Sequence, residues 1–168
     1  TGPEGKIINR IYIEEATDIK KELYLGLVFD RSSECIMVVA STEGGMSVEE
    51  ISQEKPETII RSKIEAAVGM QEFQAREIAF GLGIDSKLIS RTAEAIRGCY
   101  KAFSELDATM VEVNPLVISE QEQVLALDCK MSFDNNALFR RNQVSELRDK
   151  TQENPSEVYA SDRGLNYV

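Results

Sequence analysis

Apolar and polar residues alternate most clearly between residues 110 and 133, in two runs separated by the polar segment 119–123. The apolar side chains that alternate in this way stand at odd positions: Val111, Val113, Val117, Leu125, Leu127, Cys129, Met131 and Phe133. Because successive side chains of a β-strand point to opposite faces, the alternation predicts a β-hairpin with one apolar face.

The other face of this hairpin is predicted to carry polar side chains. If the chain turns about residue 121, Asn114 lies opposite Asp128 and Glu112 lies opposite Lys130. Directly paired residues have Cβ atoms about 4.5–5.5 Å apart, which lets a hard cation such as Mg²⁺ take one oxygen from each strand. The same pattern is equally typical of an amphipathic hairpin whose polar face is only solvated. Pro115 lacks an N–H and favours a bulge, which would shift the register by one residue.

Shorter periodic runs predict the elements around this hairpin. Alternating or continuous apolar runs predict strands at residues 7–14, 21–30, 34–41 and 58–64. Helical spacing, with capping residues or a closing glycine, predicts helices at residues 47–54, 72–82 and 87–106. The result is an α+β domain with a mixed or antiparallel sheet and packed helices. Gly44 and Gly45 suit a turn in the first place and a loop beside an active site in the second.

Composition excludes several classes of function. The 168 residues suit one domain, and 19 Lys and Arg against 29 Asp and Glu give a net charge of −10. This balance argues against nucleic acid or an anionic membrane surface as a partner. The sequence contains no histidine, so no histidine base, nucleophile or metal ligand comes from this chain. Three scattered cysteines without C-x-x-C spacing indicate reduced thiols in a cytosol-like compartment.

Three longer motifs carry a family resemblance. They are Met-Val-Glu-Val-Asn-Pro-Leu-Val at 110–117, Ala-Leu-Asp-Cys-Lys at 126–130 and Asn-Ala-Leu-Phe-Arg at 136–140. Together they resemble the nucleotide-grasp region in the β subunits of succinyl-CoA synthetase and malate–CoA ligase, which have the ATP-grasp fold. The resemblance runs over essentially the whole chain. It implies that residues 1–164 are an ATP-grasp lobe of a larger subunit, and that residues 165–168 begin the linker to a CoA-ligase domain.

The resemblance also implies roles for individual residues. Glu14 would lie at the edge of the adenine ring, and Thr17 would line its pocket. Glu22 would accept hydrogen bonds from the ribose hydroxyls, although a glutamate at the start of a strand is usually just solvent-exposed. Asn114 and Asp128 would bind Mg²⁺ against the phosphates of ATP or ADP.

Glu112 resembles the catalytic glutamate that meets a phosphohistidine loop of the partner α subunit. The implied enzyme is an ADP-forming ligase of the tricarboxylic acid cycle, which converts a dicarboxylate, CoA and ATP into an acyl-CoA, ADP and phosphate. It would work in the cytoplasm, or in the mitochondrial matrix of a eukaryote. The isolated chain is expected to be inactive.

Several alternatives stay open at this point. The chain could be a scaffold of ATP-grasp fold that docks a partner subunit without binding nucleotide. It could also serve an ATP-grasp enzyme with another product, although the Asn-Ala-Leu-Phe-Arg motif argues against that. The motifs near residues 67–77 and 162–167 look somewhat closer to malate–CoA ligase than to succinyl-CoA synthetase. The preference for ATP or GTP is left open.

Overall fold

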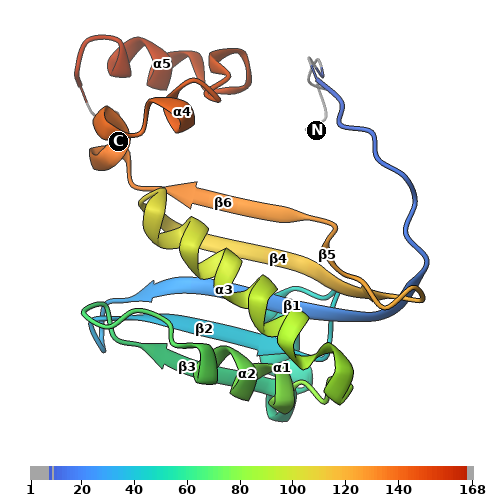
Figure 1. Cartoon of the computed structure of the whole chain (residues 1–168). Helices are drawn as coiled ribbons and strands as arrows, with labels where there is room; N and C mark the ends of the chain where they lie inside the picture. The colour runs from blue at the N-terminus through green and yellow to red at the C-terminus, as the bar shows by residue number, and fades with distance from the viewer. Residues whose placement is uncertain (1–7, 9, 166–168) are drawn as a thin grey trace. The chain divides into compact units, whose positions relative to one another are not determined.

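One antiparallel sheet forms the framework of the larger of two units (Figure 1). The computed structural model describes residues 8 and 10–165, and their contacts group residues 17–137 into this unit. The strand order is β3-β2-β1-β4-β5, with β6 pairing to β4. The strands are β1 (Ile19–Asp30), β2 (Cys35–Ser41), β3 (Ile59–Ile64), β4 (Ala108–Ser119), β5 (Val124–Ala126) and β6 (Cys129–Phe133).

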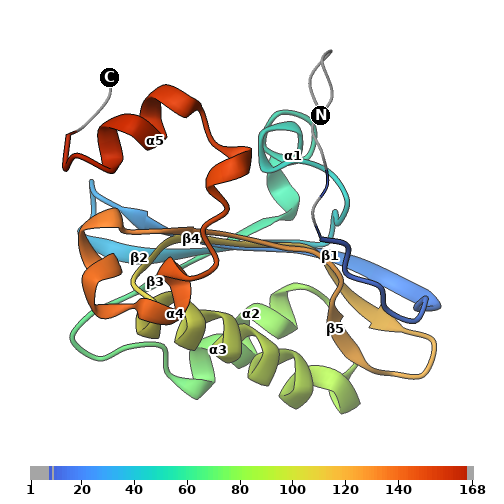
Figure 2. The same ribbon diagram turned by 90° about the horizontal axis from the view of Figure 1, so that it is seen from above.

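Helices cover this sheet unequally on its two faces. Figure 2 shows α2 (Glu72–Gly81) and α3 (Ile89–Glu105) below the sheet and α1 (Val48–Glu54) above it. The main core lies on the side of α2 and α3, where Leu23, Leu25 and Leu27 of β1 are completely buried. Ile51 of α1 is also completely buried but lies outside that core. The sheet therefore has one thickly packed apolar face and one face with a single short helix.

The predicted helices form for the local reasons that the sequence offers. Ser47 caps α1 through a reciprocal capping box with Glu50. Gly83, with a φ of 63°, follows α2 and takes the left-handed conformation that ends helices. Asp85 accepts a hydrogen bond from the Lys87 N–H and starts a 3₁₀ turn, Ser86–Leu88, which leads into α3. The helices predicted at 47–54, 72–82 and 87–106 are thus confirmed. The last of them begins with a 3₁₀ turn.

The strands predicted at 21–30, 34–41 and 58–64 are confirmed as β1, β2 and β3. The strand predicted at 7–14 is wrong for its described residues, which have no regular secondary structure. Ile11, Tyr12 and Ile13 are all exposed there. A strand needs a neighbour for its backbone, and no strand of the sheet pairs with the described residues of this segment. Residues 7 and 9 lie outside the described residues.

The smaller unit comprises the described parts of residues 1–16 and 138–168. It contains α4 (Asn142–Ser145), a 3₁₀ turn at Lys150–Gln152 and α5 (Pro155–Ser161). A further 3₁₀ stretch, Asn135–Arg140, crosses from the larger unit into it. Its charged side chains pair locally, as in the 2.6 Å contact between Arg148 and Glu153. Such exposed pairs contribute little stability. All three cysteines of the chain are free.

Candidate functional site

The predicted register of the hairpin is confirmed at both of its polar pairs. Glu112 of β4 pairs with Lys130 of β6. The Asn114 N–H donates to the Asp128 carbonyl at 3.2 Å, so these two residues also lie opposite each other. The turn at residues 119–123 thus sets the pairing that the sequence predicts.

The alternation of faces, however, changes within β4. Val111 and Val113 belong to the core before Pro115, and Leu116 and Ile118 belong to it afterwards. The predicted placement of Val117 on the same face as Val111 is therefore wrong: Val117 is buried, but outside that core.

The register of β4 against β1 explains this change. Leu23 pairs with Leu116 and Leu25 pairs with Val113, so three steps along β4 match two steps along β1. One extra residue in β4, at Asn114–Pro115, makes a bulge. Pro115 cannot donate to a neighbouring strand, which is the reason to expect a bulge at this position.

The second arm of the hairpin is interrupted opposite the bulge. β5 ends at Ala126 and β6 begins at Cys129. In between, the Leu127 N–H donates to the Pro115 carbonyl at 3.2 Å. Leu125, predicted on the apolar face, lies outside the core, and Val124 packs against the core instead. Asp128 thus lies in a break between two strands with its side chain exposed.

The side chain of Asn114 holds a loop from another part of the unit. Its Oδ1 accepts a hydrogen bond from the Gly45 N–H at 2.7 Å. Its Nδ2 donates to the Met46 carbonyl at 2.8 Å. The oxygen thus faces an N–H donor and the nitrogen a carbonyl acceptor, which fixes the orientation of the amide. The loop between β2 and α1 is therefore fastened to β4.

The same loop lies directly against Glu22 of β1. A Cβ atom on Gly44 would lie 2.5 Å from the Leu23 nitrogen and 2.6 Å from the Glu22 Cβ. A Cβ atom on Gly45 would lie 3.0 Å from Glu22 Oε2, and Gly45 has a φ of +79°. The two glycines thus bring Glu22 and Asn114 to one place. Gly44 and Gly45 thus form the turn that the sequence predicts in the first place, and this turn also lies beside predicted site residues.

Tyr24 lies on this face beside Glu112. Gly26 pairs with Glu112, and a Cβ on Gly26 would lie 2.7 Å from the Tyr24 hydroxyl oxygen. Burial, followed by the negative charges of Glu112 and Glu49, raises the pKa of Tyr24 to about 12. The phenol is therefore neutral at physiological pH, next to the carboxylate predicted to be catalytic. This neighbour was not predicted, because no motif marks a tyrosine at that position.

The remaining predicted nucleotide residues lie before β1. Thr17 is half-buried at the start of the larger unit. Next to it, the Asp18 carbonyl accepts from the Glu120 N–H at 2.9 Å, which ties this segment to the turn of the hairpin. Glu14 is exposed, has no regular secondary structure and belongs to the smaller unit. The adenine roles of Glu14 and Thr17 stay predictions.

The oxygens of Asn114 and Asp128 fit Mg²⁺ only if a bound ligand, such as a phosphate, supplies further oxygens to the ion. Within the described residues, no group of three or more His, Cys, Asp and Glu side chains could hold a metal ion. Asn114 Oδ1 keeps one lone pair after it accepts the Gly45 N–H, and the Asp128 carboxylate is exposed. One amide and one carboxylate suit Mg²⁺, which commonly binds one or two protein oxygens together with phosphate and water.

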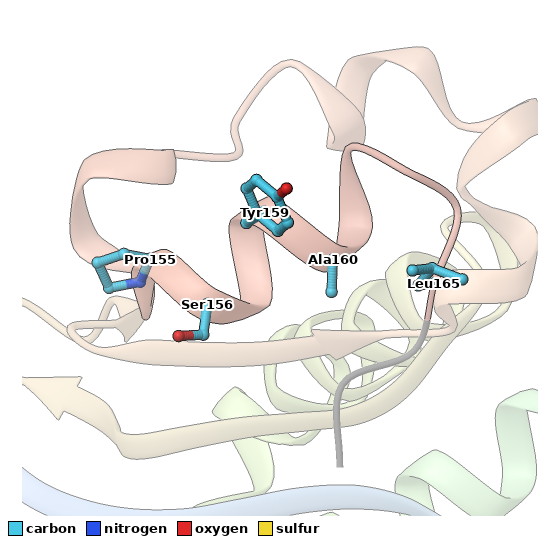
Figure 3. A pocket seen from close by; sticks show the side chains of 5 residues that line it. All are labelled: Pro155, Ser156, Tyr159, Ala160 and Leu165. Atoms are coloured by element: carbon cyan, nitrogen blue, oxygen red, sulfur yellow. The ribbon is translucent and has the colours of Figure 1, made fainter.

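A pocket of about 440 Å³ lies in the smaller unit (Figure 3). The residues that line it come from α5 and the segment after it: Pro155, Ser156, Tyr159, Ala160 and Leu165. None of the predicted site residues lines this pocket. Among the described helices, none combines the length and apolar character that crossing a bilayer requires.

The sequence matches known proteins over its full length. The profile of the ATP-grasp domain matches residues 1–118. A Mesorhizobium japonicum protein named probable malate–CoA ligase subunit beta is 57% identical over 100% of this chain and 43% of its own length. The ADP-forming succinate–CoA ligase subunits beta of Paramagnetospirillum magneticum and Bacillus subtilis are 45% and 47% identical over 100% of this chain, and 42% and 44% of their lengths. The chain thus spans less than half of these relatives.

Solved structures share its fold. ATP citrate lyase from Methanothrix soehngenii, in complex with citrate and coenzyme A, aligns with a TM-score of 0.55 at 17% identity. That alignment covers 89% of this chain and 34% of the lyase chain. The D541A mutant of Methanosaeta concilii ATP citrate lyase aligns with a TM-score of 0.57 at 16% identity, over 87% of this chain and 33% of that chain. At such identities the likeness concerns the fold alone.

Proposed function

The chain belongs to the ATP-grasp family, and we propose that it is the nucleotide-binding part of the β subunit of an ADP-forming acid–CoA ligase. One observation carries the proposal. The Gly44–Gly45 turn lies against Glu22 while Asn114 holds it, and Asn114 faces Asp128 across the hairpin. Glu22 and Asn114, distant in sequence, thus both lie against one glycine turn, which supports the assignment of a nucleotide site there. In this proposal the lobe extends over residues 1–164 and residues 165–168 begin a linker.

The residues of this chain would position the nucleotide and neutralise its charge. Glu22 can accept two neighbouring hydroxyl donors, which suits a ribose. Asn114 and Asp128 would hold Mg²⁺, which when bound screens the phosphate oxygens during phosphoryl transfer. Glu112 would orient a histidine brought by the partner α subunit, as carboxylates orient imidazoles elsewhere. No histidine of this chain can take that part.

Malate is our proposed acid substrate. The identity to the named malate–CoA ligase subunit is 57%, against 45% and 47% for the two succinate–CoA ligase subunits. Assaying the complete α and β subunits with each acid decides this: faster turnover of succinate would overturn the assignment to malate. A cytoplasmic or mitochondrial location stays a prediction.

A titration of this chain with Mg²⁺ and ADP, followed by NMR amide shifts, tests the nucleotide site. We expect shifts at Glu22, Gly45, Asn114 and Asp128 that are larger with Mg²⁺ than with EDTA. The competing scaffold function predicts normal pairing with a partner subunit but no shifts with nucleotide. Absence of shifts in both this chain and the full-length subunit would therefore refute the proposal.

A further inference from the structure

The loop between β2 and α1 is held to β4 by one side chain, an arrangement we call the Asn114 clamp. It consists of the Asn114 amide, the Gly45 N–H at 2.7 Å and the Met46 carbonyl at 2.8 Å. The partners are 69 and 68 residues away from Asn114 in the sequence. An asparagine whose two polar ends are both bonded has one orientation, because exchanging its oxygen and nitrogen would oppose donor to donor.

Both ends of the loop are anchored independently of the clamp. At its start, Ser41 shares a 2.8 Å hydrogen bond with Thr58, and the Glu43 N–H donates to the Ser41 hydroxyl at 3.2 Å. The Glu43 carboxylate pairs with Lys55 at 2.5 Å. At its end, Ser47 caps α1. The loop between β2 and α1 is thus held at both ends, so its backbone can orient the Asn114 side chain.

Gly45 is required in the clamp for two reasons. Its φ of +79° lies in the left-handed region that side chains rarely adopt. A Cβ atom would also lie 3.0 Å from Glu22 Oε2. Any side chain here would push the Glu22 carboxylate away, twist the backbone, or pull the N–H away from Asn114. Gly45 therefore lies against the Glu22 carboxylate and donates to the Asn114 amide at the same time.

We propose that Gly45 is a positioning residue for the metal site: its N–H orients the Asn114 amide and leaves the second lone pair of Oδ1 for a cation. This inference rests on the proposed function and extends it to a residue that touches neither nucleotide nor metal. It assigns the Gly44–Gly45 turn the task of holding the ribose-binding and metal-binding groups at a constant separation. The clamp stays closed when nucleotide binds.

The direct test uses the unmodified chain. A scalar coupling through the hydrogen bond between the Gly45 amide ¹⁵N and the Asn114 ¹³Cγ reports whether the clamp is closed. We expect this coupling in the free chain, with ADP in EDTA, and with ADP and Mg²⁺. Its loss when Mg²⁺ and ADP bind would overturn the proposal, because Asn114 would then release the loop to take the metal. Its absence in the free chain would overturn it as well.

A matched pair of variants tests the effect on metal binding. Gly45→Ala introduces a Cβ at a positive φ beside Glu22, and Gly83→Ala introduces one at a φ of +63° with nothing within 4 Å. The measurement is the ratio of the ADP dissociation constants in EDTA and in Mg²⁺. We expect Gly45→Ala to lower this ratio by about tenfold, a typical effect of losing support for a ligand, and Gly83→Ala to change it by less than about twofold.

Equal effects of the two variants would show a general backbone strain and overturn the inference. If Gly45→Ala fails to fold by circular dichroism, the coupling in the unmodified chain decides instead. The failure of the proposed function looks different: no Mg²⁺-dependent response of the unmodified chain to ADP, at any residue. A normal response of the unmodified chain that Gly45→Ala retains in full would overturn this inference alone.

Discussion

The two faces of the sheet use neighbouring residues of the same strands in opposite ways. On one face, Leu23, Leu25 and Leu27 of β1 are completely buried in the core with α2 and α3. On the other, Glu22 lies against a glycine turn and Asn114 hydrogen-bonds to that turn. One face is held by non-directional apolar packing, and the other by hydrogen bonds with fixed partners. Along β1, odd positions therefore face the core, and even positions such as Glu22 face the side of the proposed site.

This separation predicts different signatures for substitutions on the two faces. Removal of buried side chains from the apolar face should lower the free energy of unfolding most, and changes at the exposed Asp128 should alter mainly the response to Mg²⁺ and nucleotide. The following predictions test the contrast, from the largest expected effect to the smallest.

The largest effect is expected from Leu25→Ala in the middle of β1. Its side chain is completely buried, so its removal leaves a cavity and should cost about 2–5 kcal/mol of unfolding free energy. Urea unfolding measures this cost. Val28→Ala in the same strand, where Val28 is 38% exposed, is the control and should cost less than about 1 kcal/mol. Similar losses at both positions would contradict the contrast between the faces.

Asp128→Ala should strongly reduce the Mg²⁺ dependence of ADP binding with little effect on stability. The carboxylate is exposed, so stability should change by less than about 0.5 kcal/mol. The ratio of the ADP dissociation constants in EDTA and in Mg²⁺ should fall at least about tenfold, which corresponds to about 1.4 kcal/mol. Glu120→Ala, an exposed carboxylate on the turn of the same hairpin, is the control. Unchanged Mg²⁺ dependence in Asp128→Ala would remove Asp128 from the metal site.

Ser47→Ala should destabilise the single helix on the polar face. It removes the capping box of α1 and should cost about 1 kcal/mol in urea unfolding. Ser52→Ala, at an exposed position inside the same helix, lacks a capping role and should be neutral or slightly stabilising. A cost no greater than that of Ser52→Ala would show that α1 does not depend on its cap.

The last prediction concerns Tyr24 and alkaline pH. Its pKa is raised from 10.0 to about 12 in the folded chain, so the fold favours the neutral phenol. This contribution to stability is fully present below pH 10 and is lost as the pH rises from about 10 towards 12. Tyr24→Phe cannot ionise, so the difference in unfolding free energy between the two proteins should shrink from pH 9 to pH 11. A difference independent of pH would place Tyr24 in an ordinary solvated environment.

Sequence reasoning succeeded where the responsible interactions are local. The turn at 119–123 fixes the register of its hairpin, because each step along one arm matches one step along the other as far as Met110 and Ser132. Capping residues such as Ser47 mark helix ends, because their partners lie within three residues. The strand predicted at 7–14 failed, because β-forming side chains do not supply a neighbouring strand.

The sequence alone therefore determined the three helices of the larger unit, most strands, the pairing of Asn114 with Asp128 and the resemblance to ATP-grasp subunits. Only the tertiary structure decided which face each residue of β4 occupies. The bulge at Asn114–Pro115 arises in the pairing of β4 with β1, a strand far away in the chain. The tertiary structure also decided that Asn114 holds Gly45 and that Glu22 lies against the same turn. Contacts between such distant segments depend on how the whole sheet packs, and no local pattern of side chains encodes them.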